Sequence, residues 1–268
     1  MSNKEIKVVL SGSGLLYPMH VGALNALHDE GYEITEIAGV SGGAIVAAAV
    51  ASGIQPGPEL EQLVLDTIPS ENQLIDVTWC PLAHWGLIKG DRIRTTLAAH
   101  FKSIFDLTEI PLKVYAVNID EQGNFHDPLY TVFGTKETPD IDISDAVRAS
   151  LSIPGVFKPH KIGGDRYVDG GLVANYPLSA FGVGEEVVGF HIRGNRDHQA
   201  PTSLKGYAKT CFRLLMESIN RQHIDEELWG QTVLLETPRS SLDFRYGTDE
   251  VLQMIRMGYE QATKQLRK

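Results

Sequence analysis

A serine within a glycine-rich pentapeptide is the first group in this sequence that could do chemistry. Gly39-Val40-Ser41-Gly42-Gly43 fits the pattern G-x-S-x-G, with a strand-like run before it and a small-residue helical run after it. A sharp turn between strand and helix would expose the hydroxyl, and glycines at 39 and 43 would let the two elements approach closely. The spacing predicts that Ser41 is a nucleophile. The alternative is a glycine-rich turn that only helps an alanine-rich helix to pack.

A second glycine loop, Gly12-Ser13-Gly14, ends the first predicted strand just before a helix. The backbone N–H groups of such a loop can bind an anion. A dinucleotide-binding loop would have a third glycine at position 17, where this chain has Tyr17. Loops that follow neighbouring parallel strands lie at the same sheet edge, so we expect an oxyanion hole beside Ser41. Its predicted donors are the amides of Gly12, Ser13, Gly14 and Leu15.

The neutral hydroxyl of a serine needs a general base, and the sequence offers two kinds. Asp169-Gly170-Gly171 follows an apolar strand end, although Asp-Gly is also a common turn dipeptide. His191 and His223 come after Asp169, which would match the chain order of a Ser–Asp–His triad. Only two strands are predicted before Ser41, however, and neither histidine lies in a glycine-rich loop. The simpler prediction is a dyad in which Asp169 takes the proton directly.

The elements that must position these groups follow from the apolar periodicity. Strands are predicted over 6–10, 34–40, 113–119, 186–191 and 231–235, with another strand ending at 167–168 and an edge hairpin over 125–133. Helices are predicted over 18–28, 42–51, 59–68, 91–105, 144–150, 204–220 and 249–266. This alternation favours a three-layer α/β/α sandwich with a mainly parallel central sheet. Without repeats or a linker, we expect a single domain over residues 1–268.

Composition excludes several classes of function. The 268 residues carry 24 basic and 34 acidic side chains, a formal charge of −10, which argues against sequence-independent nucleic-acid binding. Cys80 and Cys211 have no CxxC spacing, so we expect no disulfide framework, metal site or cofactor. Apolar runs stay below the roughly 18 residues of a transmembrane helix, and the first residues do not resemble a secretory signal. A cytoplasmic protein is the expectation.

Taken in order, the three motifs resemble those of the patatin-like phospholipase family. The resemblance extends to residues 149–159, similar to the family's helix-to-proline segment, and to residues 86–91, similar to its turn into a mid-chain helix. It spans about residues 6–180 and implies a lipid acyl hydrolase with Ser41 as nucleophile, Asp169 as general base and the 12–15 loop as oxyanion hole. The family loop usually reads Gly-Gly-Gly-x-Lys/Arg-Gly. Leu16 and Tyr17 replace its basic residue and last glycine, which leaves loop geometry and head-group preference open.

The predicted reaction is two-step acyl transfer from a phospholipid or another acyl lipid, through an acyl-enzyme on Ser41. Two other classes of function stay open at this point. The same serine could act on a thioester as a thioesterase or acyltransferase, or the altered loop could mark a non-catalytic binding protein built on this fold. The sequence predicts no particular oligomeric state.

One aromatic and apolar segment has no place in this chemistry. Its members are Trp79, Pro81, Leu82, Trp85, Leu87 and Ile88. The segment could lie on a membrane in a transient peripheral contact, or it could form a lid or packing loop over the acyl pocket.

Overall fold

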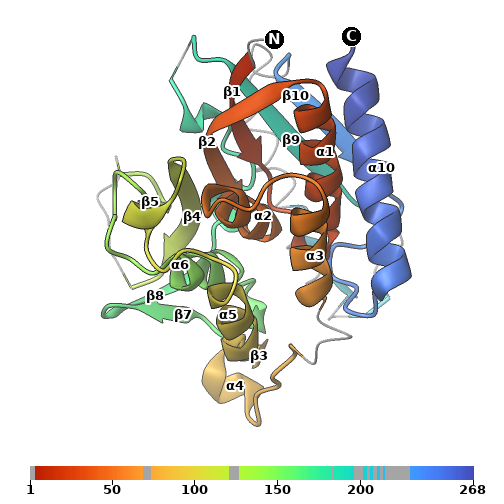
Figure 1. Cartoon of the computed structure of the whole chain (residues 1–268). Helices are drawn as coiled ribbons and strands as arrows, with labels where there is room; N and C mark the ends of the chain where they lie inside the picture. The colour runs from red at the N-terminus through yellow and green to blue at the C-terminus, as the bar shows by residue number, and fades with distance from the viewer. Residues whose placement is uncertain are drawn as a thin grey trace.

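The computed structural model describes residues 4–68, 74–120, 127–182, 184–195, 202–203, 206–207, 210–211, 214 and 230–268. Within them, a mainly parallel sheet is flanked by helices, which confirms the predicted α/β architecture (Figure 1). Most of the helix predicted over 204–220 lies outside the described residues, although residues 206–207, 210–211 and 214 are described and helical, and the start of the hairpin predicted over 125–133 also lies outside them. No helix of the described part is long and apolar enough to span a bilayer.

The main sheet has the strand order β10-β9-β1-β2-β4-β8-β7, and β5 also pairs with β4. The first five of these strands run parallel, whereas β5 and β8 run antiparallel to β4. The strands are β1 (Lys4–Leu10), β2 (Tyr32–Val40), β4 (Leu112–Asn118), β5 (Thr131–Gly134), β7 (His160–Ile162), β8 (Asp165–Asp169), β9 (Val187–Arg193) and β10 (Thr232–Glu236). A second, two-stranded sheet joins β3 (Gly86–Ile88) to β6 (Gly155–Phe157).

The described α-helices are α1 (Pro18–Asp29), α2 (Gly42–Ala51), α3 (Pro58–Asp66), α4 (Pro81–His84), α5 (Asp91–Ala98), α6 (Ile143–Ser150), α7 (Gly171–Ala174) and α10 (Thr248–Leu266). Three short 3₁₀ turns, η1 (Gly14–Leu16), η2 (Phe105–Leu107) and η3 (Leu178–Ala180), complete the set. The prediction of one helix over 91–105 is wrong, because the helix ends at Ala98. Ile104 is extended and pairs with Asp142, which places Phe105 in the core.

Alternation along the central strands sorts their side chains between two cores. In β1, Val8 and Leu10 enter a large core beneath the helices, whereas Val9 faces a smaller core on the other side of the sheet. The smaller core is covered by α7 and η3, which contribute Ala174 and Leu178. The three predicted layers are therefore present in the described residues, with a thick helical layer on one face and a thin one on the other.

Helices α1 and α10 pack along each other on the outer side of the thick layer (Figure 1). Two glycines permit their close approach. A Cβ on Gly22 would clash with the carbonyl oxygen of Ile255, and a Cβ on Gly258 would clash with that of Met19. The obstacles are backbone atoms, which cannot rotate away as a flexible side chain can. Glycine is therefore required at both positions for this helix contact.

We predict that Gly22→Ala and Gly258→Ala each lower the free energy of unfolding by about 1–3 kcal/mol, because overpacking outweighs the gain in helix propensity. Urea unfolding followed by circular dichroism measures the change. Gly164→Ala is the matched control, since a Cβ there meets nothing within 4 Å. Equal midpoints for Gly22→Ala and Gly164→Ala would contradict the close contact.

Candidate active site

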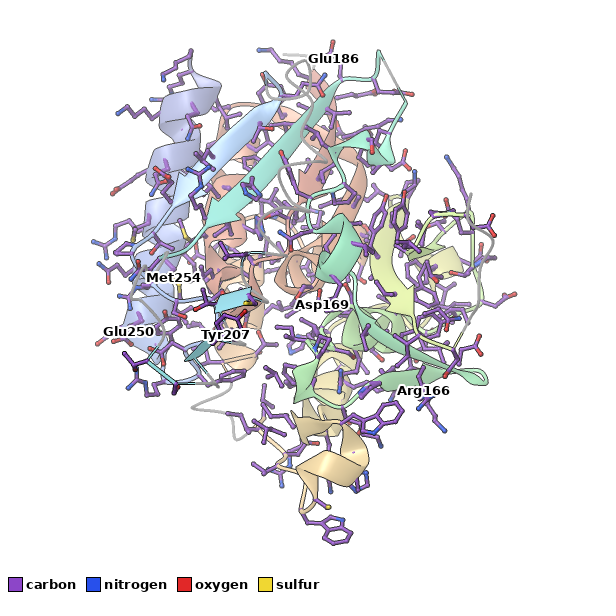
Figure 2. The ribbon with its side chains drawn as sticks, turned by 180° about the vertical axis from the view of Figure 1, so that it is seen from behind. Arg166, Asp169, Glu186, Tyr207, Glu250 and Met254 are labelled. Atoms are coloured by element: carbon purple, nitrogen blue, oxygen red, sulfur yellow. The ribbon has the colours of Figure 1, made fainter. Side chains whose placement is uncertain are left out.

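Ser41 and Asp169, 128 residues apart in the chain, are joined by a short hydrogen bond. Ser41 Oγ donates to Asp169 Oδ2 at 2.7 Å, and both side chains are buried. Figure 2 shows Asp169 next to the short helix α7, which begins two residues after it. The two side chains that the sequence nominated as nucleophile and base therefore lie within proton-transfer distance.

The register of the sheet explains how they meet. Val114 of β4 pairs with Gly39 of β2 and also with Phe133 of β5, so β2 and β5 lie on opposite edges of β4. Two residues further along β4, Ala116 pairs with Thr131 of β5 and with Asp169 of β8. Strand β8 therefore occupies the same edge of β4 as β2, beyond the point where β2 ends. Because β8 runs antiparallel to β4, its last residue, Asp169, lies directly beyond Val40, the last residue of β2.

The turn at Ser41 has the strained geometry expected of a nucleophile between a strand and a helix. Ser41 has φ 49° and ψ −123°, a conformation that non-glycine residues rarely adopt. The flanking glycines have no room for a side chain: a Cβ on Gly39 would lie 2.6 Å from the Gly43 carbonyl oxygen, and one on Gly43 would lie 2.6 Å from that of Leu10. Helix α2, buried along its whole length, begins directly after the serine.

The end of helix α6 and the residues just after it support both members of the pair, a role that our sequence prediction missed. Ser150 Oγ accepts the Ser41 N–H at 2.8 Å, and the Ser152 carbonyl accepts the Asp169 N–H at 3.0 Å. The buried guanidinium of Arg148 donates to Ser152 Oγ at 2.7 Å and to the Lys158 carbonyl at 3.0 Å. The resemblance had marked residues 149–159 without assigning them a role. The available signal was a pair of serines at the end of an apolar helix, beside a proline.

The carboxylate of Asp169 is held in a defined orientation and in a dry environment. Oδ1 accepts the Gly171 N–H at 2.7 Å, which leaves Oδ2 directed at the serine. Burial raises the pKa of Asp169 to about 6, and the hydrogen bonds from Ser41 and Gly171 offset part of that rise. Gly170 lies against the Tyr115 carbonyl, so a side chain there would push the turn away from the sheet. Asp169 is thus mainly ionised at neutral pH and more basic than an exposed aspartate.

The glycine loop lies beside the start of α2, but its four predicted donors are not equivalent. The Gly12 N–H donates to the Asn175 carbonyl at 2.8 Å, and the Leu15 N–H donates to the Ser241 carbonyl at 2.9 Å. The amides of Ser13 and Gly14 have no acceptor among the described residues. A Cβ on Gly42 would lie 2.7 Å from Ser13 Oγ, so the loop and the helix N-terminus are in direct contact.

The histidines considered for a triad lie elsewhere or outside the described residues. His191 is on β9, two strands from β2, and its ring packs against Tyr176 at 5.0 Å. His223 is among the residues that the structure does not describe. His20 is buried under the glycine loop with Nε2 2.9 Å from the Ser11 carbonyl, and burial lowers its pKa to about 3. The described hydrogen bonds of the Asp169 carboxylate go to Ser41 and Gly171.

Ser41 lines an apolar pocket that has a cavity volume of about 50 Å³ and is partly open to solvent. The pocket is lined by Gly14, Leu15, Tyr17, Ser41, Ile45, Thr67, Ile93, Leu97, Leu151, Ile153, Phe157, Ser241, Leu242 and Phe244. Leu242 is exposed at the rim, whereas Leu97, Tyr17 and Thr67 are buried and form the floor. This apolar lining suits an apolar ligand chain.

The two residues that differ from the family's loop pattern, Leu16 and Tyr17, lie in different environments. Leu16 is fully buried in the large core, where no basic side chain would be tolerated without a partner. Tyr17 lines the pocket, and its hydroxyl lies 2.9 Å from Thr67 Oγ1 and 3.2 Å from the Thr67 carbonyl. Tyr17 therefore fills space at the pocket floor that a glycine would leave open.

The aromatic segment does not cover this pocket. Trp79, Trp85 and Leu87 are exposed and are absent from the pocket lining, so these three side chains form neither a lid nor a packing layer over it. Ile88 is buried beside Phe157. The described residues also contain no cluster of three or more histidine, cysteine or acidic side chains that could hold a metal ion.

Comparisons with known proteins find relatives by sequence and by fold. A protein of Acanthamoeba polyphaga mimivirus is 30% identical over 195 residues, which cover 68% of this chain and 63% of that protein. The Bacillus subtilis protein YqhO is 29% identical over 238 residues, or 80% of each chain. The crystal structure of VipD from Legionella pneumophila shares the fold at 14% identity, with a TM-score of 0.55 over 100% of this chain and 67% of VipD.

The family model described as patatin-like phospholipase matches residues 8–181. This range contains the glycine loop, the serine turn and the Asp-Gly-Gly turn, and it covers well over half of the chain. The chain therefore belongs to the patatin-like phospholipase family.

Proposed function

We propose that this protein hydrolyses fatty acyl esters of lipids, with Ser41 as nucleophile and Asp169 as general base. The observation that carries the proposal is the 2.7 Å hydrogen bond between the two side chains at the edge of an apolar pocket. The pocket offers an acyl chain a dry site, and the buried carboxylate offers the hydroxyl a base with a raised pKa. Family membership supports the same class of reaction.

In the proposed first step, Asp169 accepts the proton of Ser41 while Oγ attacks the ester carbonyl carbon. The carbonyl oxygen becomes an oxyanion, and the N–H groups of Ser13 and Gly14 are the donors we assign to it, aided by the N-terminus of α2. When the tetrahedral intermediate collapses, the bond to the leaving alcohol breaks and the alcohol takes the proton from Asp169. The product of this step is an acyl-enzyme on Ser41.

In the second step, Asp169 deprotonates a water molecule, which attacks the acyl carbonyl. Collapse of the second intermediate returns the proton to Ser41 and releases the fatty acid. The strained turn at Ser41 and its hydrogen bond from the Ser41 N–H to Ser150 keep Oγ in one position through both steps. A thioester could enter the same pocket, so a comparison of phospholipid with acyl-CoA identifies the preferred acyl donor.

We predict that Ser41→Ala and Asp169→Asn each lower kcat on a short chromogenic ester on the order of a thousandfold or more, because each removes a group that takes part in both steps. Ser41→Ala also abolishes labelling by a fluorophosphonate probe. Ser103→Ala and Asp140→Asn, at exposed positions, are the matched controls and keep full activity. Wild-type protein that is folded yet neither labels nor hydrolyses any ester would favour the binding-protein alternative.

The pH dependence of the reaction follows from the raised pKa of Asp169, which burial moves to about 6. Below that pH the carboxyl is protonated and cannot accept the serine proton, so we predict that kcat/KM falls about tenfold per pH unit. Above it, kcat/KM is level until another group titrates. A pH–rate profile on a soluble ester measures this limb, and a profile that is flat between about pH 5 and about pH 7 would exclude Asp169 as the base.

Tyr17 is expected to limit the length of the acyl chain, because its buried ring closes the pocket floor beside Thr67. We predict that Tyr17→Ala shifts the maximum of kcat/KM toward longer p-nitrophenyl esters, whereas Tyr17→Phe, which keeps the ring, leaves the maximum in place. Thermal unfolding of each variant checks that the fold persists, since loss of a buried ring costs about 3–5 kcal/mol. The same chain-length profile in all three proteins would remove Tyr17 from the specificity determinants.

A further inference from the structure

A group of apolar side chains is exposed to solvent on the segment that precedes α5. Val77, Trp79, Trp85 and Leu87 have exposed fractions of 66%, 86%, 54% and 52%. We call these four residues the tryptophan platform. Single exposed apolar residues are ordinary, but two tryptophans and two aliphatic residues within eleven positions are typical of a contact surface.

The tryptophan platform lies at the active-site end of the molecule. Figure 1 shows α4 and β3 beyond the end of the main sheet, and Figure 2 shows them at the opposite end from Glu186, which precedes β9. The pairing of β3 with β6 connects the platform to the pocket. Ile88 and Phe157 are paired and buried, and Phe157 lines the pocket, whereas Leu87 faces solvent on the other side of the same small sheet.

The platform is held in its exposed conformation. Trp85 has φ 59°, in the left-handed region that disfavours bulky residues. The Arg166 guanidinium lies 4.5 Å from the centre of its ring, and Arg166 is itself paired with Asp120. Thr78 ties the two ends of the segment together, through its N–H to the Leu87 carbonyl and its hydroxyl to the Gly86 carbonyl, both at 2.8 Å. These contacts hold Trp85 in its strained backbone conformation, and its ring remains half exposed.

Three lysines lie on elements that adjoin the platform, although the whole chain has a formal charge of −10. Lys89, Lys158 and Lys161 are exposed and form no salt bridge within the described residues. Lys89 follows β3, Lys158 donates its N–H to the Ile88 carbonyl, and Lys161 pairs with Arg166, which contacts Trp85. The nearby carboxylate of Asp76 is occupied by the amides of Gly90 and Asp91 at the start of α5.

We propose that the tryptophan platform docks on the surface of an anionic phospholipid bilayer and inserts its two tryptophans at the headgroup level. Tryptophan favours this depth because its ring is apolar and its N–H is polar, and lysines beside it would meet the phosphates. The inference rests on the proposed function in one respect: docking here would bring the pocket close to its acyl substrate. It adds a surface that the hydrolytic chemistry does not require.

Binding to vesicles tests the proposal independently of catalysis when all proteins carry Ser41→Ala. The probes are sedimenting vesicles of phosphatidylcholine alone and of phosphatidylcholine with phosphatidylglycerol. We predict that Trp79→Ala with Trp85→Ala lowers the partition coefficient on the mixed vesicles about tenfold or more. Leu129→Ala, at an apolar side chain that is 76% exposed elsewhere, is the matched control and binds like its parent. Lys89→Gln, Lys158→Gln and Lys161→Gln together remove the preference for phosphatidylglycerol.

With Ser41 restored, the tryptophan variant keeps its kcat/KM on a soluble short ester and loses hydrolysis of vesicle lipid. Parent protein that does not sediment with mixed vesicles, or a tryptophan variant that binds as well as the Leu129 control, would overturn the proposal. So would a platform that instead joins two copies of the chain, seen as a dimer by light scattering that the tryptophan variant loses. Failure of the proposed function is a separate result, because it appears as absent hydrolysis of the soluble ester.

Discussion

The site depends on the burial of one carboxylate against one hydroxyl. An ionised aspartate in a dry site is costly, and Asp169 reduces that cost with hydrogen bonds from Ser41 and Gly171, while its pKa rises to about 6. These contacts also aim the carboxylate, since Oδ1 is taken by the backbone and Oδ2 is left to the serine. Much of the surrounding structure, from the glycine turns to the serines of α6, serves to keep this pair dry and close.

The sheet achieves the juxtaposition by placing two strands of opposite direction end to end on one edge of β4. In a purely parallel sheet, the loops after the strands would share a common edge. The last residue of one strand would not, however, face the last residue of another. The last residue of α6, Ser150, then bonds to the backbone of Ser41, and Ser152, two residues beyond the helix, bonds to that of Asp169, so one short segment supports the proposed nucleophile and base. The same helix carries Arg148, which donates to Ser152 Oγ and to the carbonyl of Gly90, three residues after the tryptophan platform.

The motifs that depend on local geometry could be predicted from the sequence. Glycines around Ser41 indicated a tight turn, and alternating apolar runs indicated a mainly parallel sheet with helices. The contacts of Ser150 with the Ser41 backbone and of Arg148 with the Gly90 carbonyl could not be predicted, because each joins residues more than fifty positions apart through a side chain that is common in helices. Strands β3, β6 and β7, with three residues each, are too short for periodicity to reveal. The sequence also could not show that the amides of Gly12 and Leu15 are hydrogen-bonded, because their acceptors, the carbonyls of Asn175 and Ser241, are distant in the chain.

The position of Asp169 at the end of β8, far along the chain from Ser41, has a consequence for the synthesis of the protein. A nascent polypeptide that has emerged only as far as α2 already contains Ser41, yet the carboxylate that accepts its hydrogen bond lies 128 residues further along. During synthesis the proposed dyad therefore cannot form until β8 has been made and has paired with β4. A chain cut short before that point would lack the base of the proposed reaction.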